Sequence, residues 1–327
     1  YSPDIFYKSF YALLCGCGLG VSLKNKYIKQ MPTIHRRNGD AVLYVIEDSI
    51  EGWADAIKAL ISSYCQHESL DYKYFGKPIK YDYSLIRPKG SYINGGFKAP
   101  GPDGLKSSIE KIELLINDSL DNLESVEFKS ILIYDILMYI SDAVLSGGIR
   151  RSAMNVIIDI DDTEMIQAKT GKWRDKNPQR ARSNNSVGLI KHSFNLEKLE
   201  ELISLNSGDN DLGFVFMNHE DDMFNPCFEI SMNFYEEIVD KNSTAFQFCN
   251  LCEINASACV DSKNNFSENK FYELCRYAAI IGTLQAGFTN FPYLGKETER
   301  IVKGEALLGV SITGWMSMPD LFNENIS

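Results

Sequence analysis

Apolar residues recur along the chain at the two spacings that distinguish strands from helices. Residues 41–46 form a β-rich run, and the helix predicted after it carries Trp53, Ala56, Ile57 and Leu60 on one face. The same reasoning predicts further helices at 109–116, 131–145 and about 268–284, and further strands at 154–158, 187–190, 214–217 and 308–312. Alternating strands and helices indicate an α/β fold, either a barrel or a wound sheet.

Two stretches interrupt this pattern. Residues 13–23 form an apolar segment punctuated by glycines, and residues from about 71 to 103 are irregular and rich in Tyr, Gly and Pro. A loop of that length is a candidate for function. The sequence shows no internal repeat and no convincing linker, and its 327 residues allow one large domain or two smaller ones.

The composition predicts a globular protein, since 44% of the residues are hydrophobic. A formal net charge of −11 argues against a nonspecific grip on nucleic acid, although the local pair Arg150-Arg151 leaves room for a small phosphorylated ligand. No run has the length of a transmembrane helix, and the N-terminus lacks a signal-peptide pattern. We therefore expect a cytoplasmic protein that binds neither membrane nor nucleic acid directly.

Eight cysteines are too sparse for a disulfide-stapled secreted scaffold of this length. Reduced thiols, some of them chemically active, fit the composition better. The chain opens at Tyr1 without a methionine and stops at Ser327 shortly after an apolar strand pattern, which indicates a fragment or a processed piece.

The hexapeptide Asn225-Pro226-Cys227-Phe228-Glu229-Ile230 is the leading candidate for chemistry. In an extended segment, Asn225, Cys227 and Glu229 point to the same side and present a hydrogen-bonding amide, a sulfur and a base to a common pocket. The alternative is that Cys227 is a small core residue after an Asn-Pro turn. The hexapeptide alone does not decide between them.

Cys249 and Cys252 have CxxC spacing, with Cys259 close behind. A structural zinc site needs four ligands, and no histidine lies at ligand spacing to these cysteines. A thioredoxin-like redox pair needs a helix that opens after a strand, for which the flanking residues give modest support. Core cysteines in a strand are the third interpretation.

Three further motifs combine small and polar residues. Gly16-Cys17-Gly18-Leu19-Gly20 lacks the third glycine of a dinucleotide fingerprint, so it predicts close approach of a ligand to the backbone rather than a Rossmann site. The segment 146–153 joins glycines to two guanidinium groups, which suits a phosphate or a nucleobase edge, although a solvated loop explains it as well. Ser183-Asn184-Asn185-Ser186 predicts turn chemistry at a strand entrance.

Taken together and in order, these motifs resemble the large catalytic subunit of ribonucleotide reductase, most closely the class II, adenosylcobalamin-dependent branch of some bacteria and phages. The resemblance spans nearly the whole chain. It is carried by nine segments: LLCGCGLGVSL, EDSIEGWADAIKALI, FKAPGPDGLKSSIEKIELL, SGGIRRSA, SNNSV, NPCFEI, FQFCNLCEINAS, GTLQAGFTNFPYLG and EALLGVSITGWM.

The resemblance implies a ten-stranded α/β barrel that forms a single catalytic domain over residues 1–327, incomplete at both ends. A finger loop at about 224–231 is expected to carry the radical cysteine into the centre of the barrel. Effector and specificity loops are expected within about 95–153.

The resemblance also implies roles for individual residues. Cys227 matches the radical cysteine, Asn225 and Glu229 match the partners of the ribose hydroxyls, and Cys249 matches one member of the reducing pair. Three further matches concern ligand contacts. Cys17 and Gly18 match backbone that flanks the substrate; Ser146, Gly147, Gly148, Arg150 and Arg151 match a specificity loop; Gly101 and Pro102 match the neighbouring effector loop.

The function implied is reduction of ribonucleotides, as triphosphates, to deoxyribonucleotides by thiyl-radical chemistry, with adenosylcobalamin as cofactor and no metal site built by the chain itself. The implied partners are a deoxynucleotide or ATP effector, a thioredoxin-like reductant and a second copy in a homodimer. Two alternatives stay open: a class I large subunit whose radical comes from a partner subunit, and an inactive nucleotide-binding fragment.

The chain departs from the pattern of this family in three ways. The other cysteine of the reducing pair is expected upstream of Tyr1, and Cys15 could replace it only with a different geometry. The family continues beyond the end of this chain into barrel strands and a reducing tail. No ATP-cone pattern is present, so regulation of overall activity by such a domain is unsupported.

Overall fold

The computed structural model describes residues 2–92, 98–145, 153–206, 208–232, 244–263 and 265–317. The chain divides into two compact units. Among the described residues, the first unit holds 2–232 and Thr244, and the second holds 245–317.

A four-stranded parallel sheet lies at the centre of the first unit, in the order β1 (Leu19–Ser22), β6 (Met154–Ile158), β7 (Ser183–Ile190) and β8 (Gly213–Met217). All five residues of β6 are buried, which is typical of parallel strands covered on both faces. Side chains of one sheet face pack toward helices. Those of the opposite face meet the short hairpin described below.

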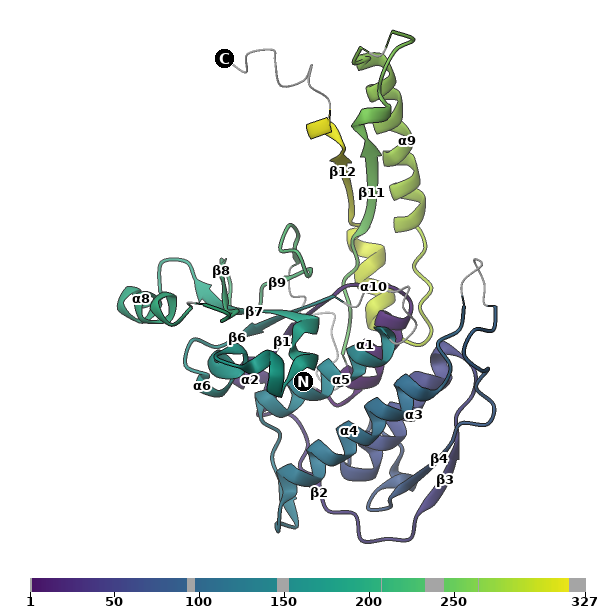
Figure 1. The fold of residues 1–327 in the computed structure, drawn as a ribbon, viewed down its shortest axis with the longest axis vertical. Coiled ribbons are helices and arrows are strands. Elements are labelled where there is room, and N and C mark those ends of the chain that lie inside the picture. Colours follow the sequence, from purple (N-terminus) through teal and green to yellow (C-terminus); the bar gives the residue numbers. More distant parts are fainter. Residues whose placement is uncertain are drawn as a thin grey trace. The chain divides into compact units, whose positions relative to one another are not determined.

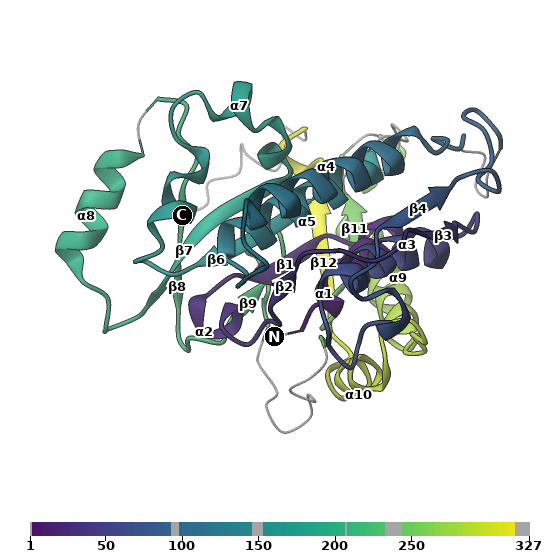
Figure 2. The same cartoon turned by 90° about the horizontal axis from the view of Figure 1, so that it is seen from below.

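A layer of long helices lies on one side of this sheet (Figures 1 and 2). Helix α5 (Ser130–Leu145) contacts the sheet directly, because its Ser141 hydroxyl bonds the Met154 sulfur and its Tyr134 hydroxyl bonds Ser183. Helix α4 (Asp103–Leu120) packs against α5, and α1 (Asp4–Leu14) packs against both α5 and α3 (Ile50–Tyr64).

Helix α3 shows why its sequence is helical. Ser49 precedes it in extended conformation and its side chain accepts a hydrogen bond from the Gly52 amide, which caps the first turn. The apolar face predicted from the sequence is buried in full, with Ala56, Ile57 and Leu60 completely inaccessible.

Short elements complete the first unit. The strand pairs are β2 (Ile34–His35) with β5 (Ser125–Val126), β3 (Val42–Val45) with β4 (Ile79–Asp82), and β9 (Met223–Phe224) with β10 (Ser231–Met232). The short helices are α2 (Asn25–Ile28), α6 (Thr163–Ile166), α7 (Trp173–Lys176) and α8 (Leu196–Leu205), with 3₁₀ turns η1 (Tyr72–Tyr74), η3 (Gln167–Lys169) and η4 (Pro178–Arg182).

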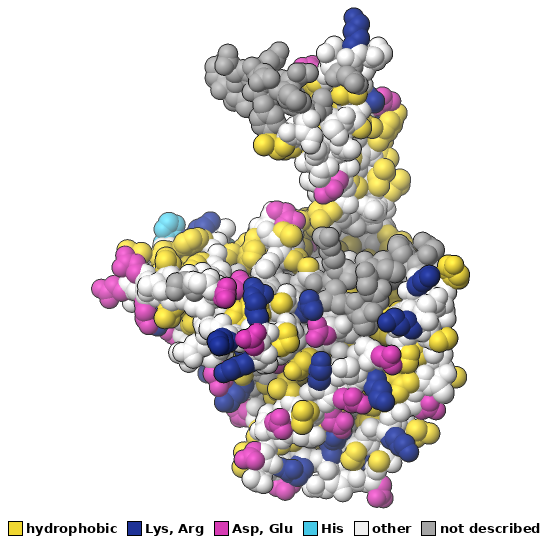
Figure 3. Space-filling view, in the orientation of Figure 1, with side chains coloured by type: hydrophobic (Ala, Val, Ile, Leu, Met, Phe, Trp, Pro, Cys, Tyr) yellow, Lys and Arg dark blue, Asp and Glu magenta, His cyan; other side chains and the backbone are white. Residues whose placement is uncertain are grey.

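The second unit is built on two parallel strands, β11 (Asn250–Asn255) and β12 (Leu308–Thr313), with α9 (Glu268–Ala286) packed on both. Helix α10 (Lys296–Glu305) and the turns η5 (Ala256–Ala258) and η6 (Trp315–Ser317) complete it. Hydrophobic side chains reach the surface along α9 (Figure 3). The large ones exposed on α9 are Tyr272, Tyr277, Ile280, Ile281 and Leu284.

The helices and strands predicted from apolar spacing are confirmed, and the fold is mixed α/β. The turn predicted at Ser183-Asn184-Asn185-Ser186 is wrong, because these residues are the first four of β7. Ser183, Asn185 and Ser186 are all buried, so short polar side chains here line a covered strand. The single-domain organisation stays a prediction. Of the helices that the structure describes, none combines the length and apolarity needed to cross a membrane.

Candidate functional site: a hairpin loop that carries Cys227

The hairpin between β9 and β10 places the predicted chemical residues in one tight loop. The Phe228 amide donates to the Asn225 carbonyl (3.0 Å), and the Ile230 amide donates to Asn225 Oδ1 (3.0 Å). The extended segment expected here is therefore wrong. Asn and Pro are the preferred first and second residues of a β-turn, and Phe228 leaves that turn with a φ of 65°.

The turn changes how the three side chains are presented. Strand alternation no longer decides their direction, because Cys227 occupies the third position of the turn. Both Cys227 and Glu229 are exposed, whereas Asn225 is half-buried and its amide oxygen is engaged inside the loop. The interpretation of Cys227 as a buried core residue is thus excluded.

Two glycines, Gly20 in β1 and Gly18 directly before it, allow the backbone of the hairpin to lie directly on the sheet. A Cβ atom at Gly20 would meet the Phe224 carbonyl oxygen at 1.8 Å, and one at Gly18 would meet Pro226 Cγ at 2.7 Å. No other residue type fits at Gly20 unless the hairpin moves. The close approach predicted from the glycine motif is therefore made at these two positions by the chain itself.

An apolar cluster holds the hairpin on this face of the sheet. Phe224 is buried with Ile157, Val215 and Met217, and the Phe228 ring packs against the Phe224 ring at a centroid distance of 5.7 Å. The turn of the loop is thus anchored through an aromatic side chain at each end.

Hydrogen bonds from Asp222 and Lys24 also hold the turn that leads from β8 into the hairpin. Asp222 accepts hydrogen bonds from the amides of Asn218 (2.9 Å) and His219 (3.0 Å). The buried Lys24 ammonium donates to the Glu220 carbonyl, and burial lowers the pKa of Lys24. Sequence reasoning missed these residues, since Lys24 reaches the Glu220 carbonyl only through the tertiary fold.

Asn184 reaches the loop from β7. Its Nδ2 donates to the Pro226 carbonyl oxygen at 3.1 Å, directly before Cys227 in the chain. The motif that contains Asn184 was visible in the sequence, but strand register was needed to show which of its side chains faces the hairpin.

Cys17 and Gly18 lie at the start of β1, where α1 ends. The amides of Cys17 and Gly16 donate to the carbonyls of Ala12 and Leu13, and Gly16 has a φ of +91°. This is the Schellman pattern of helix termination, so the first glycine of the motif ends a helix. Burial, with a smaller contribution from Cys15, raises the pKa of the Cys17 thiol to about 11.

Cys249 and Cys252 lie in the second unit, on opposite faces of the two-stranded sheet. Cys252 faces α9, where its sulfur lies 3.5 Å from the Cβ position of Gly282. The Cys249 sulfur instead lies 3.8 Å from the Cβ position of Gly309 on β12. A zinc site or a redox pair made by these two cysteines is therefore wrong, because a strand turns side chains three residues apart to opposite faces.

The predicted ligand loops are described in part. Pro102 is the N-cap residue of α4, and Gly101 precedes it with a φ of +75°. A Cβ atom at Gly101 would lie 2.9 Å from the Lys89 amide nitrogen. Ser146, Gly147, Gly148, Arg150 and Arg151 lie outside the described residues.

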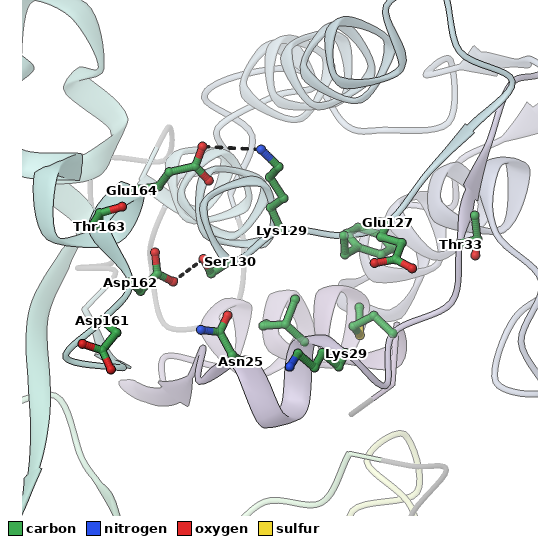
Figure 4. A pocket seen from close by; sticks show the side chains of 13 residues that line it. Asn25, Lys29, Thr33, Glu127, Lys129, Ser130, Asp161, Asp162, Thr163 and Glu164 are labelled. Atoms are coloured by element: carbon green, nitrogen blue, oxygen red, sulfur yellow. Dashed lines mark hydrogen bonds and ion pairs between the residues drawn. The ribbon is translucent and has the colours of Figure 1, made fainter.

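A separate cavity of about 420 Å³ lies in the first unit between α2, the start of α5 and α6 (Figure 4). Its walls are charged: Lys129 and Glu164 form an ion pair there, and the Ser130 hydroxyl bonds Asp162 (Figure 4). None of the predicted site residues that the structure describes lines this cavity. Within the described ranges no three His, Cys, Asp or Glu side chains are grouped so as to hold a metal ion.

Comparison with known proteins places this geometry in context. The chain is 26% identical over 293 residues to a probable adenosylcobalamin-dependent ribonucleoside-triphosphate reductase of Dictyostelium discoideum, covering 83% of this chain and 34% of that protein. It is 27% identical over 314 residues to the adenosylcobalamin-dependent ribonucleoside-triphosphate reductase of Lactobacillus acidophilus, covering 90% of this chain and 38% of that protein. The resemblance to this reductase family is confirmed.

A solved structure agrees with this at the level of the fold. A B12-dependent class II ribonucleotide reductase superposes on 96% of this chain and 46% of its own chain, with a TM-score of 0.67 and 20% identity. No family model matches the chain. The chain thus spans 34% and 38% of the length of the two curated relatives and under half of the solved one.

Proposed function

We propose that the protein reduces ribonucleoside triphosphates to deoxyribonucleotides by thiyl-radical chemistry. The observation that carries this proposal is the hairpin loop, which presents the Cys227 thiol at an exposed turn between Asn225 and Glu229. The relatives named above support the triphosphate substrate by the activity in their names.

We also propose a barrel of ten strands around this hairpin, which the sheets of the described residues do not by themselves close. Four strands run parallel in the first unit and two in the second, and the chain superposes on a class II reductase over nearly its whole length. In this proposal the hairpin is the finger loop.

Each residue of the loop has a chemical task. The Cys227 thiyl abstracts the 3′ hydrogen of the ribose, a reversible step because S–H and activated C–H bonds are similar in strength. Glu229 accepts the proton of the 3′-hydroxyl as general base. Because Asn225 Oδ1 is held by the Ile230 amide, the Asn225 Nδ2 hydrogens serve to orient the ribose hydroxyls.

Cys249 and a second cysteine supply the reducing equivalents. Their two thiols provide two electrons and two protons, the 2′-hydroxyl leaves as water, and one disulfide forms. A thioredoxin-like reductant then restores the two thiols by exchange.

Adenosylcobalamin fits as the radical source because the Cys227 thiol is exposed in the described chain and so accessible to an initiating group. When bound, it supplies the radical that generates the thiyl. The class I alternative is less favoured, since both curated relatives are named as adenosylcobalamin-dependent.

The remaining roles follow the family resemblance. Cys17 and Gly18 are proposed to flank the substrate, and Gly101 and Pro102 to belong to a loop that responds to a deoxynucleotide or ATP effector. The specificity segment proposed for base selection comprises Ser146, Gly147, Gly148, Arg150 and Arg151. A cytoplasmic homodimer is proposed as the working form.

The first experiment assays the full-length protein with adenosylcobalamin, a dithiol and a ribonucleoside triphosphate. We expect deoxynucleotide formation and an electron paramagnetic resonance signal from cob(II)alamin coupled to a thiyl radical. Cys227→Ser should abolish both, whereas Cys275→Ser, at a half-buried position on α9, should retain them.

Other results would redirect the proposal. Activity only with a metal-containing partner subunit would establish the class I alternative. Nucleotide binding without turnover, and unaffected by Cys227→Ser, would leave an inactive nucleotide-binding protein.

A further inference from the structure

We propose that Asn184 is a positioning residue that sets the orientation of the Cys227 thiol. The inference rests on the proposed function, and it begins from one contact between β7 and the hairpin. Asn184 Nδ2 donates to the Pro226 carbonyl at 3.1 Å. That carbonyl belongs to the peptide group whose nitrogen is the Cys227 amide, so the bond fixes the peptide plane from which Cys227 projects.

The side chains around Asn184 show that the sheet does not need it for packing. Ser183 and Asn185 point to the helix side of β7, where the Ser183 hydroxyl lies 3.0 Å from the Tyr134 hydroxyl and donates to Asn185 Oδ1 at 2.7 Å. Both are buried, whereas Asn184 between them is exposed. Within this motif, Ser183 and Asn185 therefore bond on the helix side, and Asn184 bonds the loop.

Pro226, which accepts the Asn184 hydrogen bond, is also contacted from a second side. Pro226 is buried, and its ring lies against Gly18, directly before β1, where an added Cβ would come within 2.7 Å of Pro226 Cγ. Strand β1, which begins directly after Gly18, and strand β7, which holds Asn184, flank β6, so Pro226 is held from both sides of β6. The Gly18 contact limits the approach of the loop, and the Asn184 bond limits the rotation of its peptide plane.

Fixing this plane matters because hydrogen abstraction depends on the position of the sulfur. A displacement of about 1 Å at a reacting atom can cost about 10²-fold in rate. Cys227 occupies an exposed turn, so few side-chain contacts of its own hold it in place. Asn184 supplies the missing constraint one peptide bond away.

The test uses the full-length protein with Asn184→Asp and Asn184→Ala. The carboxylate of the first variant has the same shape but cannot donate to the Pro226 carbonyl, and the second variant removes the group altogether. Because Asn184 is exposed, neither change disturbs the core. We expect kcat to fall about tenfold or more, with KM for the nucleotide changed by less than about twofold, because the constraint acts on the reacting sulfur.

Two further readouts separate positioning from a general structural effect. The coupling in the cob(II)alamin–thiyl signal should change in both variants, since it reports the place of the sulfur. Exchange of the Phe228 and Ile230 amide hydrogens, both bonded within the loop, should rise about fivefold by mass spectrometry.

The matched control is Asn155→Ala. Asn155 is the neighbour of Asn184 in the register of β6 and β7, on the same face of the sheet, and its side-chain amide has no hydrogen-bond partner. Because Asn155 has no side-chain hydrogen bond to lose, its removal should leave kcat, the coupled signal and loop exchange within about twofold of the parent protein. Equal effects from Asn155→Ala and the Asn184 variants would overturn the proposal, as would an unchanged kcat in Asn184→Asp.

Failure of the proposed function gives a different result. In that case the parent protein itself shows neither reduction nor a coupled signal. Loop exchange still tests the placement of the Cys227 peptide by Asn184, and unchanged exchange in both Asn184 variants would reject it.

Discussion

Gly20 is the residue at which the hairpin backbone comes closest to the sheet. The Phe224 carbonyl occupies the space that any Cβ at Gly20 would need. We expect Gly20→Ala to destabilise the protein by about 1–3 kcal/mol, the usual cost of overpacking, as measured by urea denaturation.

The control for Gly20→Ala lies on the same strand. Ser22→Ala removes a buried hydroxyl that has no hydrogen-bond partner, so it should be neutral or slightly stabilising. A Gly20→Ala variant as stable as its parent would show that the hairpin does not rest on β1.

Cys17 illustrates how burial changes the chemistry of a thiol. Its pKa is raised from 9.0 to about 11, so the neutral thiol is the form present at neutral pH. Its thiolate fraction near pH 8 should then be about a hundredfold smaller than that of an ordinary cysteine.

Alkylation with iodoacetamide, followed by mass spectrometry of the Cys17 peptide across pH 7–11, measures this directly. We expect slow modification that accelerates until about pH 11, whereas a short peptide of the same sequence levels off near its ordinary pKa. Equal profiles in the protein and the peptide would contradict the burial of this thiol.

At the scale of elements, Cys249 directly precedes β11 and Cys252 lies within it, on the face toward α9. Since the two thiols project from opposite faces, mild oxidation with diamide should yield no disulfide between them in peptide maps. The positive control is Gly309→Cys, whose Cβ would lie 3.8 Å from the Cys249 sulfur and which should form a disulfide with it readily. A Cys249–Cys252 disulfide in the parent protein would overturn this arrangement of β11.

The hairpin and β7 are the two elements whose local structure the sequence motifs predicted wrongly. Asn225 and Pro226 are residues of strong turn preference, so the turn had a signal in the sequence that the strand interpretation overrode. For β7 a turn was predicted and a strand was found. Its polar residues favour turns, but they form a buried strand in which Ser183 bonds Tyr134 of α5.

At the scale of the whole molecule, the chain consists of two units, each with parallel strands as its framework. The first unit holds the hairpin with Cys227, and the second holds Cys249. The proposed reaction needs both thiols, the first as radical carrier and the second as reductant.

The sequence by itself determined the helices and strands with strong apolar periodicity, such as α3 and β6, because local spacing alone sets which face of an element is buried. It also determined the family resemblance, which depends on the order of motifs along the chain. Only the tertiary structure decided that Gly18 and Gly20 receive the hairpin and that Asn184 bonds Pro226. These contacts join β1, β7 and the hairpin across more than forty residues of sequence, and strand register, which local preferences do not encode, sets them.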